Sequence, residues 1–240
     1  MTARLLVMMS VVVGALHLGP PPLARPRFKV LPQDEAGQVP AFRAYRDALQ
    51  AAVAARDADR VVPMIHPEIR EVFGRTLRIT KEQLGGAEHQ DWTALDELLR
   101  LGGTFSKGLH RVRDSGERQY ATREFCAPYT WSAYPQPVPN ELVRQSQADP
   151  WVVLGTGVAV RARPPRDMRV LMRLDYDLVH PFSTADFHAG APKAWIGILT
   201  PEGRRGYVAA HLIRSRYDYH ACFGEFDGAW LMTEFQRGGG

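Results

Sequence analysis

The sequence contains little lysine and no concentrated run of positive charge. Its lysines are Lys29, Lys81, Lys107 and Lys193, so the remaining 26 of its 30 basic residues are arginine, and the net charge is +4. The arginines are spread along the chain between acidic residues. Recognition of nucleic acid needs a basic stripe or a base-reading motif. We therefore expect no nucleic-acid partner.

The sequence also lacks the short motifs that mark common catalytic centres. It has no Gly-x-Ser-x-Gly, no His-Glu-x-x-His and no phosphate-binding loop. A papain-like hydrolase needs a cysteine near the start of its domain and a histidine further along. Cys126 is followed by His180 and later histidines, but these lie within or after a separate strand-rich segment at 151–216. We therefore expect no enzymatic activity and no cofactor.

The densest group of polar side chains has no clear metal-ligand spacing. Carboxylates and imidazoles bind divalent cations, but the spacing of a tetrahedral site is absent. Two of the aspartates alternate with apolar residues, which favours a strand with one solvated face over a metal site. The group comprises Asp175, Asp177, His180, Asp186 and His188.

Cysteine is scarce, with Cys126 and Cys222 as the pair present. In an oxidising compartment such a pair forms a disulfide. The alternative is two buried free thiols, since free cysteine is among the most buried residue types. The sequence leaves both open, and neither cysteine has the spacing of a metal site.

No apolar run is long enough to span a bilayer. Arg4 precedes an apolar run from Leu5 to Leu16, and prolines follow it. This pattern predicts a signal peptide at 1–24, cleaved after Ala24 or after Ala15. An uncleaved membrane anchor is the alternative, and a lipoprotein is disfavoured because no cysteine follows the run. We expect a periplasmic or secreted protein with no stable membrane insertion after cleavage.

The remaining chain predicts an α+β protein. Residues 25–40 are typical of a linker, and 41–150 of a helix-rich α+β domain. A helix is expected from Pro40, a second from the cap Asp57 through Ile65, and a third from Asp91 to the Gly102-Gly103 stop. The Thr80–Gln83 segment is a capping-box pattern that predicts a further short helix. A short connector helix is expected at 140–147.

Two hairpins are also predicted. Strands at 105–112 and 118–125 flank a turn at 114–116. Strands at 219–223 and 230–235 flank Asp227-Gly228, a strong hairpin signal. The second hairpin falls in a C-terminal unit at 217–237, which we expect to pack on the α+β domain or on the strand-rich segment.

Residues 151–216 contain short strand-like runs separated by turn residues, which is typical of a small barrel. The first strand contains Val160-Arg161 followed by Pro164, and later strands contain Trp195 and Gly206-Tyr207-Val208. This combination resembles the bacterial SH3-like domain, although the loop at 180–194 is longer than in that family. The resemblance implies that Trp195 and Tyr207 are partly core residues. Together with Tyr176, they could instead line a groove for an extended peptide or glycan strand.

A wider pattern covers most of the chain. It comprises Trp92-x-x-Leu95, Phe125-x-Ala-Pro-Tyr129, Arg214-Ser-x-Tyr217 and Gly228-x-Trp230. This pattern resembles a family of uncharacterised exported bacterial proteins in which an N-terminal α+β region is joined to an SH3-like barrel. That family has no known activity to carry over.

The first helix is followed by Ala55–Asp59 and then by Met64-Ile-His-Pro-Glu68. This opening resembles the nuclear-transport-factor-like cone fold, in which a terminal hairpin completes the sheet. The resemblance implies that the C-terminal hairpin returns to the first domain and that the barrel is an insertion. It also raises the alternative of a small-ligand or catalytic pocket in that domain, with His66, Glu68 and His89 as polar candidates.

These observations favour an exported, non-enzymatic binding or structural protein. The SH3-like module is expected to contact cell-wall peptide, glycan or a protein partner. A purely structural role, with the two parts packed together and no small ligand, is the other possibility that the sequence leaves open.

Overall fold

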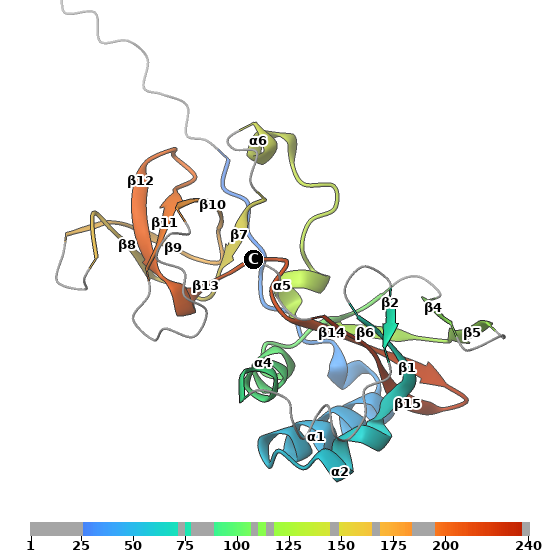
Figure 1. The fold of residues 1–240 in the computed structure, drawn as a ribbon. Coiled ribbons are helices and arrows are strands. Elements are labelled where there is room, and N and C mark those ends of the chain that lie inside the picture. Colours follow the sequence, from blue (N-terminus) through green and yellow to red (C-terminus); the bar gives the residue numbers. More distant parts are fainter. Residues whose placement is uncertain are drawn as a thin grey trace, which may run out of the picture.

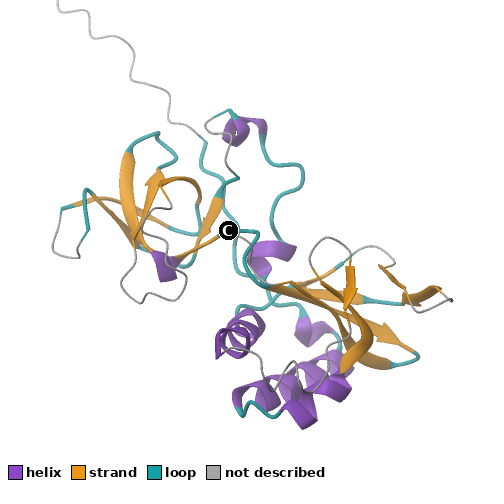
Figure 2. Ribbon diagram, viewed as in Figure 1, coloured by secondary structure: helices purple, strands orange, loops and turns teal. Residues whose placement is uncertain are grey.

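The computed structural model describes residues 26–71, 75–77, 89–106, 110–113, 118–144, 149–164, 169–183 and 195–236. Helices and strands form two lobes, each built on its own sheet (Figures 1 and 2). The α+β class is therefore confirmed. The predicted signal peptide lies outside the described residues. Among the helices that are described, none is long and apolar enough to cross a membrane.

The first sheet has the strand order β2-β1-β15-β14-β6-β3. Its strands are β1 (Ile65–Glu71), β2 (Arg75–Leu77), β3 (Thr104–Phe105), β6 (Glu124–Ala127), β14 (His220–Phe226) and β15 (Ala229–Gln236). A separate ribbon pairs β4 (His110–Arg113) with β5 (Arg118–Ala121). The predicted 105–112 and 118–125 hairpin is therefore divided, because its ends β3 and β6 join the first sheet; its turn lies outside the described residues.

The C-terminal hairpin lies in the middle of the first sheet. β14 pairs antiparallel with β6, and β15 pairs parallel with β1. Asp227 and Gly228 form the turn with φ values of 49° and 81°, the left-handed geometry that an Asp-Gly hairpin favours. The hairpin thus returns to the first sheet, as the cone-fold resemblance implies. The strands of the second sheet are inserted in the sequence between β6 and β14.

Helices α1 (Pro40–Ala54), α2 (Ala58–Val61) and α4 (His89–Arg100) belong to the first lobe. The first helix is present as predicted, and Phe42, Leu49 and Val53 are buried at helical spacing on it. Asp57 caps α2 by accepting a hydrogen bond from the Arg60 backbone N–H. The second helix is shorter than predicted: η2 (Val62–Met64) follows it and β1 begins at Ile65. Pro63 explains this end, since proline has no N–H to continue the helix.

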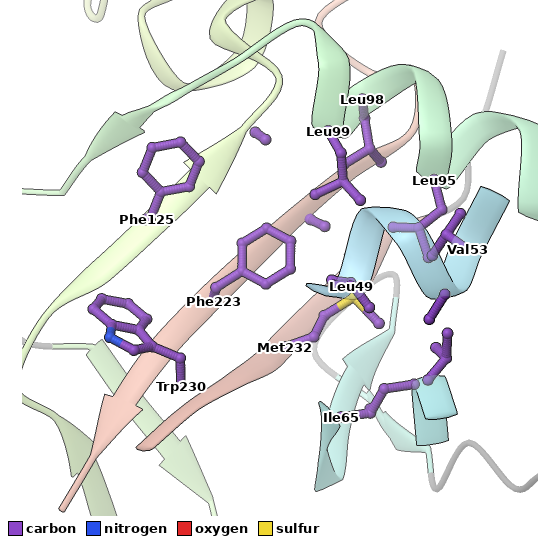
Figure 3. Packing of buried hydrophobic residues seen from close by; sticks show 14 of the residues in the cluster. Leu49, Val53, Ile65, Leu95, Leu98, Leu99, Phe125, Phe223, Trp230 and Met232 are labelled. Carbon is purple, nitrogen blue, oxygen red and sulfur yellow. The ribbon is translucent and has the colours of Figure 1, made fainter. Parts of the chain in front are cut away.

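The core of the first lobe lies between these helices and the sheet (Figure 3). The Phe42 ring centroid is 4.4 Å from that of Phe125 and 4.7 Å from that of Trp230. Leu95, Leu98 and Leu99 of α4 also pack into this core. Such apolar burial is the main source of stability in a domain of this size.

The second sheet has the order β13-β7-β10-β11-β12-β8-β9. Its strands are β7 (Trp151–Val153), β8 (Val158–Arg161), β9 (Val170–Leu174), β10 (Leu178–Ser183), β11 (Trp195–Leu199), β12 (Arg205–Ala209) and β13 (Ile213–Arg214), with η4 (Ala210–Leu212) before β13. Its own core contains wholly buried Val160, Leu174, Ile196, Ile198 and Val208. Within the described residues the edge strands β9 and β13 do not pair, so the sheet does not close into a barrel there.

The expected linker lies against both lobes, and we call residues 26–38 the strap. The Val30 N–H donates to the Tyr176 carbonyl at 3.0 Å, and the Leu178 N–H donates to the Phe28 carbonyl at 2.8 Å. After Val30 the strap continues to η1 (Ala36–Gln38). The Glu35 N–H donates to the Gly103 carbonyl of the first lobe at 2.9 Å. Two short helices, α5 (Tyr129–Ser132) and α6 (Asn140–Val143), lie on the connection from β6 to β7.

Candidate functional site

Trp195 and Tyr207 share the outward face of β11 and β12. Their neighbours Ile196, Ile198 and Val208 are fully buried on the opposite face, and side chains alternate along a strand. Tyr207 is paired directly with Gly197, and Trp195 with Ala209. Both aromatic side chains are half-buried. The structure therefore brings two of the three predicted ligand-binding residues together on one face.

Phe182, which the sequence did not single out, completes this face. Phe182 falls within residues 180–194, which the sequence predicts as a loop, but β10 extends to Ser183 and includes it. A Cβ atom on Gly197 would lie 2.7 Å from the Phe182 ring, so the ring occupies the space that glycine leaves open. The rings of Phe182 and Tyr207 are 6.0 Å apart and meet edge to face at 73°. The Arg205 guanidinium carbon lies 5.1 Å from the Phe182 centroid. We call Phe182, Trp195, Arg205 and Tyr207 the platform.

Tyr176, the third predicted ligand-binding residue, does not belong to the platform. It occupies the turn between β9 and β10 with φ of 57°. Its N–H donates to the Gly155 carbonyl at 3.0 Å, and its carbonyl accepts from the strap. Gly155 precedes the start of β8, whereas Arg161 at the other end of β8 is paired with Tyr207. Tyr176 therefore lies at the opposite end of β8 from Tyr207, beside the strap.

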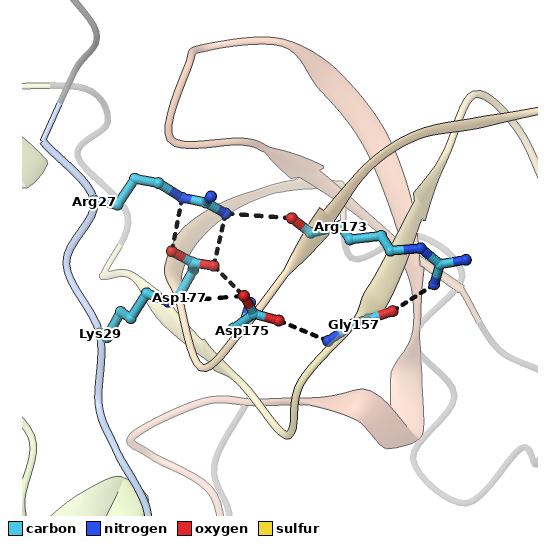
Figure 4. Close-up of polar contacts among 6 residues, drawn as sticks. All are labelled: Arg27, Lys29, Gly157, Arg173, Asp175 and Asp177. Carbon is cyan, nitrogen blue, oxygen red and sulfur yellow. Dashed lines mark hydrogen bonds and ion pairs between the residues drawn. The ribbon is translucent and has the colours of Figure 1, made fainter.

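Two residues of the polar group, Asp175 and Asp177, hold the strap against the second lobe (Figure 4). The Asp177 side chain has zero exposure, so the expectation of a solvated position is wrong for it. Arg27 donates to Oδ1 at 3.0 Å and to Oδ2 at 2.8 Å of this carboxylate. Asp175 is half-exposed and accepts from the Gly157 N–H at 2.7 Å. His180 is buried, while Asp186 and His188 lie outside the described residues.

Cys126 and Cys222 form a disulfide. They are directly paired across β6 and β14, with their Cα atoms 4.1 Å apart. Glu124 lies beside them, with its carboxylate and the two sulfur atoms within 4.8 Å of one another, and it is buried. Both sulfur atoms are used in the covalent bond, so this group offers no thiolate to a metal. The bond joins β6 to β14, the two strands between which the second lobe is inserted in the sequence.

Of the three polar candidates of the first lobe, the structure describes the side chain of His66 alone. His66 is buried on β1, and its ring centroid is 5.2 Å from that of Phe226. Glu68 lies further along β1, and His89 is the first residue of α4. Between α1 and the sheet, the Phe42 ring packs against the rings of Phe125 and Trp230.

Buried polar groups fix the junction between the lobes. Arg214 bonds the Glu97 carboxylate of α4 at 3.1 Å and the Tyr219 carbonyl at 2.6 Å. Asp218 accepts from the Ser215 N–H at 2.9 Å. Burial raises the pKa of this carboxyl above its usual value, although the Arg214 guanidinium acts in the opposite direction. Burial also raises the pKa of the Tyr129 phenol to about 12.

Comparison with models of known protein families, with curated proteins and with solved structures finds no match to this chain. The function is therefore inferred from the geometry of the platform and the junction.

Proposed function

We propose that this protein is a non-catalytic binding protein that acts in the periplasm or after secretion. In this proposal its second lobe is an SH3-like recognition module, as in the family of exported proteins that the sequence resembles. The disulfide suits an oxidising compartment, and the predicted signal peptide would direct the chain there. The ligand is an extended polymer of the envelope: cell-wall peptide, glycan or a segment of a protein partner.

The platform is the observation that carries this proposal. Two of its half-buried aromatic side chains, Trp195 and Tyr207, project from regularly paired strands, whose hydrogen bonds hold the backbone in place. Tryptophan, tyrosine and arginine are the residues that most often dominate binding energy at interfaces. A binding surface on a rigid sheet also loses little conformational entropy when the ligand arrives.

Two further observations support a binding role over a catalytic one. The disulfide takes up both cysteines, so the chain has no thiol nucleophile in this state. The first lobe has rings packed at its centre, with Phe42 touching several others. This arrangement supports a scaffold that presents the second lobe rather than a lobe with its own ligand cavity.

Retention on purified, insoluble cell-wall polymer tests the wall-binding form of the proposal. We expect the exported protein to be retained at low and moderate salt, and Tyr207→Ala to weaken retention about tenfold, a loss typical of an interface aromatic. Tyr217→Ala is the matched control, because this exposed tyrosine lies at the junction between the lobes. Equal retention of both variants would contradict binding at the platform. Absence of any retention would exclude the wall polymer and leave the protein partner.

A further inference from the structure

Positive charge is concentrated on part of the second lobe. Residues 158–174 and 199–209 contain seven arginines and two acids, a formal charge of +5, whereas the whole chain carries +4. These residues include β8, β9 and β12, which are neighbours in the sheet. Exposed arginines in the described part of this region are Arg163, Arg169, Arg173, Arg204 and Arg205. Five of the seven arginines lie within residues 161–173 of the sequence. Because β12 is the neighbour of β8 in the sheet, Arg204 and Arg205 are added to this basic region in space.

Arg205 connects this basic region to the platform. Its guanidinium is held over the Phe182 ring, and that ring is in turn fixed between Gly197 and Tyr207. In the described part of the chain, no carboxylate forms an ion pair with Arg205. A guanidinium that is already positioned loses less freedom on binding, and its planar fork matches the two oxygens of a carboxylate.

The same geometry disfavours a neutral glycan. A sugar ring stacks on an open aromatic face, but the guanidinium of Arg205 covers a face of Phe182. Phe182 and Tyr207 meet edge to face, so these two rings do not offer a common flat surface. A ligand that approaches the platform therefore meets the guanidinium of Arg205 and the ring of Tyr207.

We propose that the platform docks an acidic peptide in extended conformation, with Arg205 as the anchor for one of its carboxylates. This inference rests on the proposed function and names its ligand class. The surrounding arginines attract the peptide over a longer range, and the half-buried aromatic rings contact its apolar groups. An acidic polysaccharide shares the charge, but Arg205 covers the face of Phe182 on which its sugar rings would stack. An anionic membrane shares the charge alone.

The test is fluorescence anisotropy with the protein purified after export. The probes are a labelled glutamate-rich peptide, the same peptide with glutamine in place of each glutamate, polygalacturonate, and phosphatidylglycerol vesicles. We expect the glutamate peptide to bind at least tenfold more tightly than the glutamine peptide, with affinity falling as salt rises. We also expect it to bind more tightly than polygalacturonate or the vesicles.

Three variants assign the anchor. Arg205→Gln should weaken binding of the glutamate peptide about tenfold or more, since a hydrogen bond to a charged group is lost. Arg204→Gln removes the same charge from the neighbouring position and should change affinity less than about threefold, as expected of screened charge alone. Arg205→Lys keeps the charge without the planar fork and should give an intermediate loss. It also serves as the second probe if the glutamine variant unfolds.

Each other outcome overturns a defined part of the inference. Equal affinity for the glutamate and glutamine peptides removes the anionic ligand but leaves the proposed binding function standing. Tighter binding of polygalacturonate or of vesicles removes the peptide assignment. Equal losses in the Arg204 and Arg205 variants remove the anchor. If the protein binds none of these probes and no wall polymer or protein partner, the proposed function itself fails.

Discussion

Replacing Arg27 tests whether the strap is a structural part of the second lobe. Arg27→Gln removes the cation from Asp177, whose side chain has zero exposure, while Arg27 itself is 35% exposed. The carboxylate would keep the Asp175 N–H at 2.7 Å as a backbone donor. Breaking a buried ion pair by removing one partner costs about 3–5 kcal/mol. Because water can reach the site that Arg27 leaves, we expect the lower end, about 3 kcal/mol.

The two partners should not be equivalent. Asp177→Asn removes the buried charge and leaves Arg27 able to turn toward solvent, so we expect a loss of about 1–2 kcal/mol. The double variant should be no less stable than Arg27→Gln alone, which a double-mutant cycle measures directly. Asp175→Asn is the matched control, since its side chain is 45% exposed. As an exposed charge it should change stability by less than about 1 kcal/mol.

Urea unfolding followed by tryptophan fluorescence gives these free energies, with the slope of the transition reported for each variant. A loss of less than about 0.5 kcal/mol for Arg27→Gln, the usual effect of a surface substitution, would refute the reasoning. It would show that residues 26–38 behave as the linker that the sequence suggests.

Three further predictions concern the disulfide, the junction and the platform. Cys126→Ser/Cys222→Ser should lower the free energy of unfolding by about 4.7 kcal/mol on the chain-entropy model, because the bonded residues are 96 apart in sequence; an unchanged urea midpoint under thiol reductant would contradict this. The pKa of Asp218 is raised in the folded state, so the folded state holds the proton more tightly. The contribution of this carboxyl to the free energy of unfolding should therefore fall as pH rises from 3.8 toward the raised pKa. Asp218→Asn should remove this slope, and identical stability-versus-pH curves would refute the assignment. Gly197→Ala should push the Phe182 ring aside, cost about 1–3 kcal/mol by overpacking and weaken binding of the glutamate peptide in anisotropy; unchanged affinity would show that the ring does not position Arg205.

The sequence predicted correctly those helices and turns that depend on a few neighbouring residues. Pro40 begins α1 and Asp57 caps α2, while Asp227-Gly228 forms the turn of the final hairpin. Each depends on a few neighbouring residues, so a short pattern is enough to identify it. The end of the second helix at Pro63 depends on tertiary pairing as well, because β1 takes over at Ile65 to join β15.

The candidate site depended on contacts that no short pattern contains. Asp177 is buried because Arg27, 150 residues away in sequence, supplies its partner. Phe182 belongs to the platform because Gly197 on the next strand leaves room for its ring. Tyr176 is separated from Trp195 and Tyr207 by the length of a strand. Sequence alone therefore identified two of the aromatic residues, but not the arginine or the ring that supports it.

Amide hydrogen exchange with and without saturating glutamate-rich peptide tests the central claim most directly. Binding at the platform predicts slower exchange in β10, β11 and β12, around Phe182, Trp195 and Tyr207. The strands β14 and β15 of the first lobe should keep their exchange rates. Protection confined to the first lobe, or spread evenly over both, would contradict recognition by the second sheet.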